Sequence, residues 1–395
     1  MANEPYSEVT SQSWGGRLME SIKGVVAGAA LFIAAFPVLW MNEGCSVDTA
    51  KGLEEGAKVA VTIDLSQYSN ENNGKLIHGS GKATTTDSVA DSQFGINLKA
   101  IKLERKVEMF QNEENVKEET KEKLGGGKET TKTYTYSTTW SSNLINSNNF
   151  KDPKAPKNPS SMPYKSENWQ ASNVKVGDYK ISKSMINQIS TDESIDYKSA
   201  GISIPSSISS RSQISNSEIY IGKDPSNPQI GDLRISHKVA NPKDVSILGQ
   251  LKNGVVGAFT TSRDTTIERL DEGTLSKEDM FAAAQKENTI MTWAVRAGGF
   301  FMMYTGLSLI LKPISTLGAV VPFLGNLLGM GLGLIAGLVS FVLTLITIAL
   351  AWIFFRPILG IALLAVAGGV GFFLWKKKKD MAAQAPPNPN PSTAG

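Results

Sequence analysis

The chain has 395 residues, of which 41% are hydrophobic and 19% charged, and its formal net charge is +3. Lys and Glu alternate rather than forming a basic stripe, so this charge gives no reason to expect a nucleic-acid partner. The charges are also unevenly placed: between Thr292 and Trp375 there is no Asp or Glu, and the basic residues there are Arg296, Lys312 and Arg356. The chain therefore combines a polar part and a membrane-like part, which we interpret separately.

The first apolar stretch covers residues 24–41, after a polar N-terminal segment of residues 1–23. About 20 apolar residues are needed to cross a bilayer, and this stretch is at the short end of the usual range. Arg17 and Lys23 precede it and Trp40 lies at its far end. No small-x-small cleavage pattern closes the stretch, so we predict a membrane anchor rather than a cleaved signal peptide.

Residues 42–291 form the polar region, in which the clearest patterns have the period of two that is typical of strands. Alternating residues at 101–109 and 134–140 surround a Gly-rich break at 125–127, which predicts a long antiparallel hairpin. Asn253-Gly254 suits a type I′ turn and predicts a second hairpin. Ser276 and Asp279 resemble a helix start that leads toward the next apolar stretch. We expect a β-rich (α+β) domain.

Three further transmembrane helices are predicted, at 293–311, 334–355 and 358–375. Residues 312–333 between the first two are expected to form a cytoplasmic, interfacial or re-entrant loop. Arg356-Pro357 indicates a tight turn between the last two helices. Residues 376–395 form a basic and then disordered tail.

Orientation follows from the preference of Lys and Arg for the cytoplasmic side. The lysine run that begins at Lys376 places the end of the fourth helix inside, and counting back through four crossings also places Arg17 and Lys23 inside. The prediction is four transmembrane helices with both termini cytoplasmic and residues 42–291 extracytoplasmic.

Two groups of residues in the apolar stretches are candidates for a role in the membrane. Small residues four apart allow close helix contact, although glycine is also simply common in membrane helices. Aromatic and basic residues at the ends of spans hold helices at the interface. The packing candidates are Gly24, Gly28, Gly329, Gly333 and Gly337, and the interface anchors are Trp40, Arg296, Arg356, Trp375, Lys376 and Lys377.

No catalytic or metal-binding motif is recognised in the sequence, and no cofactor is predicted. His78 and His237 are the only histidines and are more than 150 residues apart, so a structural role is favoured for each. A Ser–Lys dyad needs no histidine, but serines and lysines are too abundant for sequence to single one out. No ionisable residue lies near the centre of a predicted span, which argues against a transporter.

Several sequence blocks together resemble the LUMA (transmembrane protein 43) family, and they follow one another in family order over about residues 14–375. The chain departs from the family pattern at Cys45, where a basic residue is expected, and over residues 190–217. Cys45 is the only cysteine, which excludes an intrachain disulfide and suggests a bacterial member. The blocks are Met41–Gly44, Ile101–Phe110, Tyr134–Phe150, Lys157–Met162, Gly231–Arg234, Met291–Leu307 and Trp352–Pro357.

The resemblance implies four spans, a large extracytoplasmic or lumenal domain, self-association, and organisation of other membrane proteins. It supplies no catalytic residues. We therefore expect a non-enzymatic membrane scaffold that forms homo-oligomers in a lipid bilayer and contacts other membrane or envelope components. Its location would be the inner membrane of a bacterium, or the endoplasmic reticulum and inner nuclear membrane of a eukaryote. The alternatives are a membrane-surface enzyme with a Ser–Lys or carboxylate site and an oligomeric channel.

Overall fold

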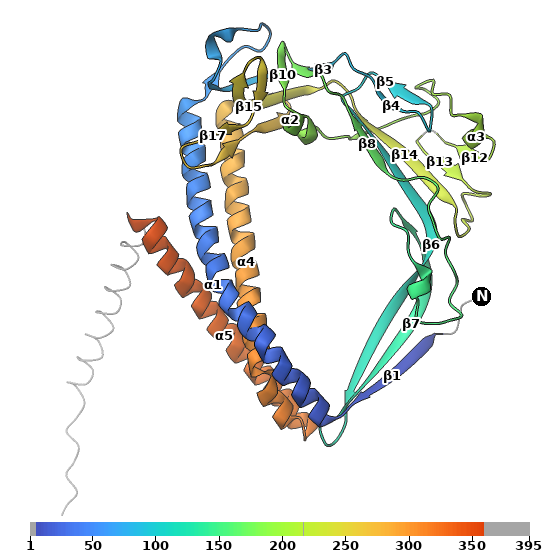
Figure 1. Cartoon of the computed structure of the whole chain (residues 1–395), viewed down its shortest axis with the longest axis vertical. Coiled ribbons are helices and arrows are strands. Elements are labelled where there is room, and N and C mark those ends of the chain that lie inside the picture. Colours follow the sequence, from blue (N-terminus) through green and yellow to red (C-terminus); the bar gives the residue numbers. More distant parts are fainter. Residues whose placement is uncertain (1–4, 216, 359–395) are drawn as a thin grey trace, which may run out of the picture. The chain divides into compact units, whose positions relative to one another are not determined.

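The structure is a computed structural model that describes residues 5–215 and 217–358. The chain divides into two compact units (Figure 1). The polar unit comprises the chain up to Arg17, Asp48–Asn288 and Gly318–Gly325, and the helical unit comprises Leu18–Val47, Thr289–Leu317 and the chain from Asn326 onward. Each unit is described by itself.

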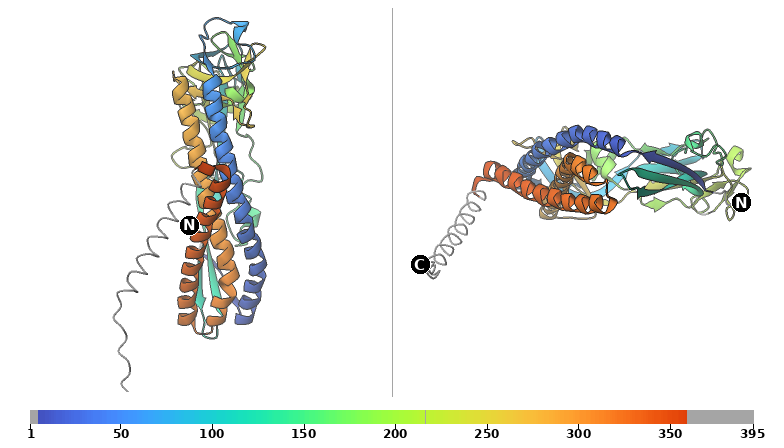
Figure 2. Two further views of the ribbon diagram at one scale, coloured as in Figure 1. Left: turned by 90° about the vertical axis from the view of Figure 1, so that its left-hand side faces the viewer. Right: turned by 90° about the horizontal axis from the view of Figure 1, so that it is seen from below.

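Three helices in the described part of the chain are long and apolar enough to cross a membrane. They are α1 (Trp14–Val59), α4 (Lys277–Gly318) and α5 (Pro322–Phe355). Their apolar stretches lie side by side in the helical unit, as Figure 2 also shows. The predicted fourth span, residues 358–375, and the tail at 376–395 lie outside the described residues except for Ile358.

The helices are longer than the predicted spans. Helix α1 continues past Met41 to Val59, and α4 begins well before residue 293 because Ser276 caps its start by accepting a hydrogen bond from the Asp279 backbone N–H at 3.1 Å. Residues 312–333 differ most from the expected loop. Helix α4 continues through Pro313 to Gly318, and α5 begins at Pro322, the helical position where proline is best tolerated.

Two antiparallel-rich sheets make up most of the polar unit. The larger has the order β1-β7-β6-β14-β13-β12, with β11 paired to β14 and β8 paired to β6. Its strands are β1 (Tyr6–Gln12), β6 (Lys102–Glu122), β7 (Lys128–Ser141), β8 (Glu167–Gln170), β11 (Glu193–Ser194), β12 (Ser212–Ile214), β13 (Ile219–Ile221) and β14 (Leu233–Ala240).

The second sheet has the order β19-β15-β16-β10-β9-β3-β2, with β15 also paired to β3. Its strands are β2 (Val61–Thr62), β3 (Leu76–Thr85), β9 (Val174–Val176), β10 (Tyr179–Ile181), β15 (Asp244–Lys252), β16 (Val255–Gly257) and β19 (Arg269–Glu272). Smaller elements complete the unit: β4 (Val89–Asp91), β5 (Ile96–Leu98), β17 (Phe259–Thr260), β18 (Thr266–Ile267), α2 (Lys183–Gln188), α3 (Ser206–Ser209), η1 (Asn70–Asn72) and η2 (Ser147–Asn149).

Both predicted hairpins are confirmed. Strands β6 and β7 pair continuously from Met109 opposite Ser141 to Glu122 opposite Lys128, and the Gly-rich turn has positive φ angles of 87° and 79° at Gly125 and Gly126. Asn253 and Gly254, with φ angles of 51° and 79°, join β15 to β16 as a type I′ turn requires.

Strand β1 extends this hairpin into a three-stranded ribbon, which was not expected. Residues Tyr6–Gln12 pair antiparallel with 128–134 of β7, and Arg17 donates to the Gly126 carbonyl and the Glu122 carboxylate, both at 2.7 Å. This pairing is at odds with the expected division into cytoplasmic residues 1–23 and extracytoplasmic residues 42–291. Two strands of one sheet share one compartment, whereas a single crossing by α1 would separate them.

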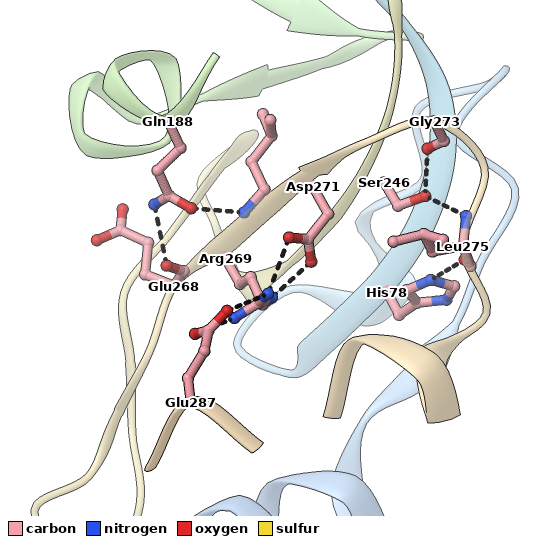
Figure 3. Close-up of polar contacts among 10 residues, drawn as sticks. His78, Gln188, Ser246, Glu268, Arg269, Asp271, Gly273, Leu275 and Glu287 are labelled. Atoms are coloured by element: carbon pink, nitrogen blue, oxygen red, sulfur yellow. Dashed lines mark hydrogen bonds and ion pairs between the residues drawn. The ribbon is translucent and has the colours of Figure 1, made fainter. Parts of the chain in front are cut away.

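The start of α4 is held against the second sheet by polar contacts (Figure 3). Arg269 on β19 forms ion pairs with Asp271 at 2.5 Å and with Glu287 on α4 at 2.7 Å. His78 on β3 donates from Nε2 to the Leu275 carbonyl at 3.1 Å, and Ser246 accepts from the Leu275 N–H at 2.8 Å. His78 therefore has a structural place in the link between sheet and helix.

Candidate functional site

The helical unit contains a buried ion pair shared by its three helices. Arg296 on α4 donates from Nε to Glu43 Oε1 at 2.7 Å and from Nη2 to Glu43 Oε2 at 2.8 Å. Trp352 on α5 donates from Nε1 to the same Oε2 atom at 2.7 Å. Glu43, on α1, is 0% exposed and Arg296 is 8% exposed. One carboxylate thus joins α1, α4 and α5.

Aromatic rings cover the guanidinium of Arg296. Its Cζ atom lies 4.6 Å from the ring centroid of Trp293 and 5.5 Å from that of Trp352. Trp293 and Arg296 are three residues apart on α4, which places both side chains on one face of the helix. The ring faces attract the cation and keep water away from it. The arginine therefore has a carboxylate and two indoles around it.

Further polar contacts continue the seam between α1 and α4. Asn42 donates from Nδ2 to the Thr292 carbonyl at 3.3 Å, and the Thr292 hydroxyl donates to that of Ser46 at 2.7 Å. Gly44 lies beside this seam, where an added Cβ would come within 2.8 Å of the Phe355 ring. Polar side chains and a small residue thus allow α1 to approach α4 and α5 closely.

A bidentate arginine–carboxylate pair is directional, and breaking it by removing one partner leaves an uncompensated buried charge. The pair therefore favours one register of the three helices over others. Its charges satisfy one another, so in this arrangement Arg296 and Glu43 are suited to hold helices together rather than to act on a substrate.

The polar unit contains a second buried arginine. Arg105 on β6 donates from Nη1 to Asp91 Oδ2 at 2.7 Å and from Nη2 to Glu167 Oε2 at 3.1 Å. Its Cζ atom lies 5.1 Å from the ring centroid of Phe94 and 5.2 Å from that of Trp169. Arg105 and Asp91 are 3% and 1% exposed in their side chains. A buried carboxylate and two rings around the guanidinium resemble the surroundings of Arg296, and Arg105 has the exposed carboxylate of Glu167 in addition.

His237 on β14 continues this network into the core. Its Nε2 lies 2.9 Å from Asp91 Oδ2 and its Nδ1 lies 2.8 Å from the Tyr197 hydroxyl. Because an ionised Asp91 can only accept, Nε2 carries the proton and Nδ1 accepts from Tyr197. His237 is 0% exposed. Arg105, Asp91, His237 and Tyr197 are therefore joined by a continuous series of buried hydrogen bonds.

Burial sets the protonation of these groups. Burial lowers the pKa of His237 despite the hydrogen bond to Asp91, so the imidazole is neutral near neutral pH. Burial by itself would raise the pKa of Asp91, but the hydrogen bond from His237 and the charge of Arg105 outweigh it and the pKa of Asp91 is lowered. Burial raises the pKa of Tyr197 and keeps its hydroxyl protonated. The structural role predicted for His237 agrees with this geometry.

The polar unit also has a groove of about 630 Å³ beside β8, β10 and α2, lined in part by Trp169, Lys180, Ser182 and Lys183. Ser182 caps α2 by accepting from the Met185 N–H, and its hydroxyl donates to Glu268. This serine is thus already used to build the fold. Across the described residues, no three His, Cys, Asp or Glu side chains gather as a metal site would require.

Comparisons with known proteins identify the family. A model of the family "Transmembrane protein 43" matches residues 109–357. Transmembrane protein 43 of mouse is 31% identical over 372 residues, which cover 90% of this chain and 91% of the relative. The chain belongs to the transmembrane protein 43 family.

Other members are similar over nearly the same length. The human protein is 31% identical and the match covers 89% of each chain, and a Drosophila melanogaster homolog is 26% identical over 88% of this chain and 92% of its own. No solved structure matches. The resemblance inferred from the sequence blocks is thus confirmed.

Three of those blocks meet at the buried pair of the helical unit. Met41–Gly44 supplies Glu43, Met291–Leu307 supplies Arg296, and Trp352–Pro357 supplies Trp352. The second arginine, Arg105, lies in the block Ile101–Phe110. Segments far apart in sequence that carry the family resemblance are therefore neighbours in space.

The sequence singled out Arg296 as an interface anchor but neither of its partners. Glu43 was assigned to the polar region, since it lies two residues beyond the predicted end of the first span. A signal was present: a single acid just after one apolar stretch and a single arginine just inside the next are opposite charges at adjacent span ends. The spacing of 253 residues concealed it.

The other predicted anchors have varied surroundings. Trp40 packs against the rings of Phe354 and Phe355, both with centroids at 5.7 Å. The backbone N–H of Arg356 bonds to the Trp352 carbonyl at 2.7 Å just after α5 ends at Phe355. Three predicted anchors lie outside the described residues: Trp375, Lys376 and Lys377.

The glycine candidates also differ from one another. An added Cβ at Gly28 would come within 2.7 Å of the Gly306 carbonyl oxygen on α4, so these two glycines bring the backbones together. At Gly24 the nearest atom would belong to Leu309 at 3.8 Å. On α5, Gly333 and Gly337 face Tyr304 at 3.8 Å, whereas Gly329 has open space. Gly306 was not among the candidates.

An apolar hollow of about 390 Å³ lies between α1 and α5 in the helical unit. Aromatic and aliphatic side chains form its walls, so it suits hydrocarbon: a lipid chain or the side chains of another helix. Its lining residues are Phe36, Pro37, Trp40, Met41, Leu343, Ile346, Thr347 and Leu350.

Proposed function

We propose that this member of the transmembrane protein 43 family is a multi-pass membrane scaffold. It self-associates and holds other membrane or envelope components through its polar unit. The observation that carries the proposal is the pairing of Glu43 with Arg296 and Trp352, because it uses two buried charges to fix how the helices pack. A scaffold needs such a defined arrangement, whereas a transporter needs ionisable groups that face a pathway.

The polar unit supports the same proposal. Three of its buried ionisable groups are linked in the interior, because Arg105 and His237 both bond to Asp91. Such a network stabilises one fold. The surface of the polar unit is then left for contact with partners.

The direct test is cross-linking in native membranes at native expression, followed by purification and mass spectrometry. A scaffold gives cross-linked multimers and a reproducible set of co-purifying membrane proteins. A chain recovered only as a monomer, with no partner above the level found with an unrelated membrane protein of equal abundance, would contradict the proposal.

The number of crossings needs its own experiment. Four spans, including residues 358–375, with both termini cytoplasmic would put residues 6–12 on the opposite side of the membrane from the polar unit, whereas these residues pair with β7 of that unit. We propose that β1 shares the compartment of the polar unit. Ser7→Cys and Ser137→Cys, each with Cys45→Ser, are treated with a membrane-impermeant thiol reagent in sealed vesicles of both orientations. Labelling of both from the same side supports the shared compartment, and labelling from opposite sides supports four crossings.

The compartment follows from the source of the chain: the cytoplasmic membrane in a bacterium, or the endoplasmic reticulum and inner nuclear membrane in a eukaryote. Fluorescent fusion of the full chain at native expression tests this. Signal confined to the cell interior away from these membranes would contradict it.

The groove beside α2 is where a membrane-surface enzyme, the alternative function, would have its site. It brings Ser182 and Lys183 to one cavity wall. A serine-reactive fluorophosphonate probe distinguishes the two functions: labelling of the wild type that Ser182→Ala abolishes, with Ser172→Ala as the control, favours the enzyme. Ser182 already caps α2 and bonds to Glu268, which favours the scaffold.

A further inference from the structure

We propose that the free edge of β1 docks onto β1 of a second copy of this chain, with the two strands antiparallel about Val9. The inference rests on the self-association in the proposed function and names the surface that carries it. It starts from the three-stranded ribbon of β1, β7 and the outer half of β6.

Strand β1 is an edge strand of the larger sheet. Its seven residues pair with β7 on one side, and among the described residues no strand pairs with the other side. A free strand edge presents unpaired backbone donors and acceptors to any other extended chain. Val9 is 59% exposed at the centre of this strand. From Tyr6 to Ser11 the edge therefore has no strand partner among the described residues, and Val9 places an apolar side chain near its middle.

The opposite edge of the same ribbon provides an internal comparison. From residue 115 to Glu122, β6 pairs with β7 alone. Charged side chains, and lysine above all, are the usual protection of a strand edge against unwanted pairing. This half of β6 carries them in five of its eight positions: Lys117, Glu118, Glu119, Lys121 and Glu122.

Strand β1 lacks this protection. Its sequence, Tyr-Ser-Glu-Val-Thr-Ser-Gln, has no lysine, arginine or proline, and its one acid, Glu8, accepts a hydrogen bond from the Tyr134 hydroxyl at 3.1 Å. The two edges of the ribbon thus differ: the β6 edge carries charged side chains that disfavour strand pairing, and the β1 edge does not. The difference favours β1 as the edge that accepts a strand.

The sequence of β1 fits pairing with itself. An antiparallel ladder about Val9 places Val9 opposite Val9 and Glu8 opposite Thr10, so no two like charges face each other. Outside these, Ser7 faces Ser11 and Tyr6 faces Gln12. A ladder centred on Glu8 would instead place two carboxylates together. Charge therefore allows a two-fold arrangement about Val9, which also pairs this exposed apolar side chain with its own copy, and two-fold dimers are the commonest homo-oligomers.

Charge at the two-fold axis gives a direct test, because residue 9 meets its own copy there. Full-length chains with two different affinity tags are co-expressed in membranes, and the fraction that co-purifies is measured. We expect Val9→Lys in both copies to weaken association about fivefold, since like charges directly opposite destabilise a strand pair. Val9→Lys with Val9→Glu should restore it. Val116→Lys is the matched control, because Val116 is 52% exposed on the charged β6 edge of the ribbon.

Disulfide formation tests the register in the same membranes. In a Cys45→Ser chain, Val9→Cys should give a covalent dimer on mild oxidation, because residues directly opposite on antiparallel strands come within reach of a disulfide. Val116→Cys should not. The combination of Val9→Lys with Val9→Glu also controls for misfolding, because a Val9→Lys chain that associates with a Val9→Glu chain must be folded.

The outcomes separate this inference from the proposed function. Copies that associate equally well with Val9→Lys in both, and give no Val9→Cys dimer, overturn the β1 edge and leave self-association in place. Wild-type copies that never co-purify overturn self-association itself.

Discussion

The two buried arginines of this protein have similar partners but lie in different environments. Arg105 lies among the strands of the polar unit, with Asp91 as its buried partner and the rings of Phe94 and Trp169 around it. Arg296 lies among the apolar helices, with Glu43 as its partner and two indoles around it. In both, a buried carboxylate pairs with the guanidinium and two aromatic rings lie against it, while Arg105 also bonds to Glu167 and the Lys165 carbonyl.

The difference lies in what each arginine loses when the structure comes apart. The chain around Arg105 unfolds into water, which solvates a free charge well. A variant that removes one partner of the pair therefore has an uncompensated buried charge in the folded state but no such cost in the unfolded state. Helices that separate within a bilayer find other polar partners there, and measured contributions of polar contacts between membrane helices are correspondingly modest. Removal of one partner of the pair should therefore cost more stability at Arg105 than at Arg296.

The largest effect is expected from Arg105→Met. It leaves the buried carboxylate of Asp91 without its cation, although His237 and the Gln93 N–H still donate to it, and breaking a buried pair in this way costs about 3–5 kcal/mol of unfolding free energy. Denaturant unfolding of the full chain in detergent, followed by tryptophan fluorescence, measures it. Arg234→Met is the control, because Arg234 also pairs with a glutamate and lies over a tryptophan but is 35% exposed. It should cost less than about 1 kcal/mol. Equal losses would show that burial does not matter.

Arg296→Met should cost less, about 1–3 kcal/mol, and the loss should be shared with Glu43. A double-mutant cycle with Glu43→Gln measures the coupling in detergent micelles, with separation of the helices as the readout. We expect a coupling of about 1 kcal/mol. Strictly additive losses would mean that the two side chains do not act as a pair, and a loss larger than that of Arg105→Met would reverse the comparison.

Trp352→Phe should have a smaller effect still, about 1 kcal/mol, because it keeps an aromatic ring near Arg296 but removes the Nε1 donor to Glu43. Trp40→Phe is the matched control, since Trp40 contacts Phe354 and Phe355 through its ring. Both are measured in the same micelle assay. If the two variants lose the same stability, the hydrogen bond to Glu43 contributes nothing beyond packing.

Acid should act on the polar unit through His237. Burial lowers the pKa of His237 in the folded chain, so between that value and the ordinary one near 6.5 the unfolded chain binds the extra proton. Stability is then complete above the ordinary value and falls as the pH drops through it, by at most about 1.4 kcal/mol per pH unit for one proton. His78, whose pKa burial also lowers, adds a contribution of the same sign.

Melting of the full chain in detergent between about pH 8 and pH 5 checks this acid response, a window in which histidine is the side chain that titrates. His237→Gln should reduce the slope, and His237→Gln with His78→Gln should nearly abolish it. An unchanged slope in the double variant would assign the acid response to other groups.

The sequence alone determined the local structure and the family. Apolar runs of sufficient length became α1, α4 and α5, because a backbone without water must satisfy its hydrogen bonds within a helix. The period of two predicted the β6–β7 hairpin, Asn253-Gly254 predicted the turn between β15 and β16, and the Ser276 cap predicted the start of α4. Each of these patterns lies within a few residues of the structure it specifies.

Only the tertiary structure decided which distant groups meet. Arg296 and Glu43 are 253 residues apart in sequence, and Asp91 and His237 are 146 apart. Strand β1 pairs with β7, although α1 lies between these two strands in the sequence. Local spacing fixes the face of a helix or strand on which a side chain lies, but its partner depends on the packing of the folded chain. The extent of α1 and α4 was decided in the same way, since tertiary contacts continue both helices past their apolar runs.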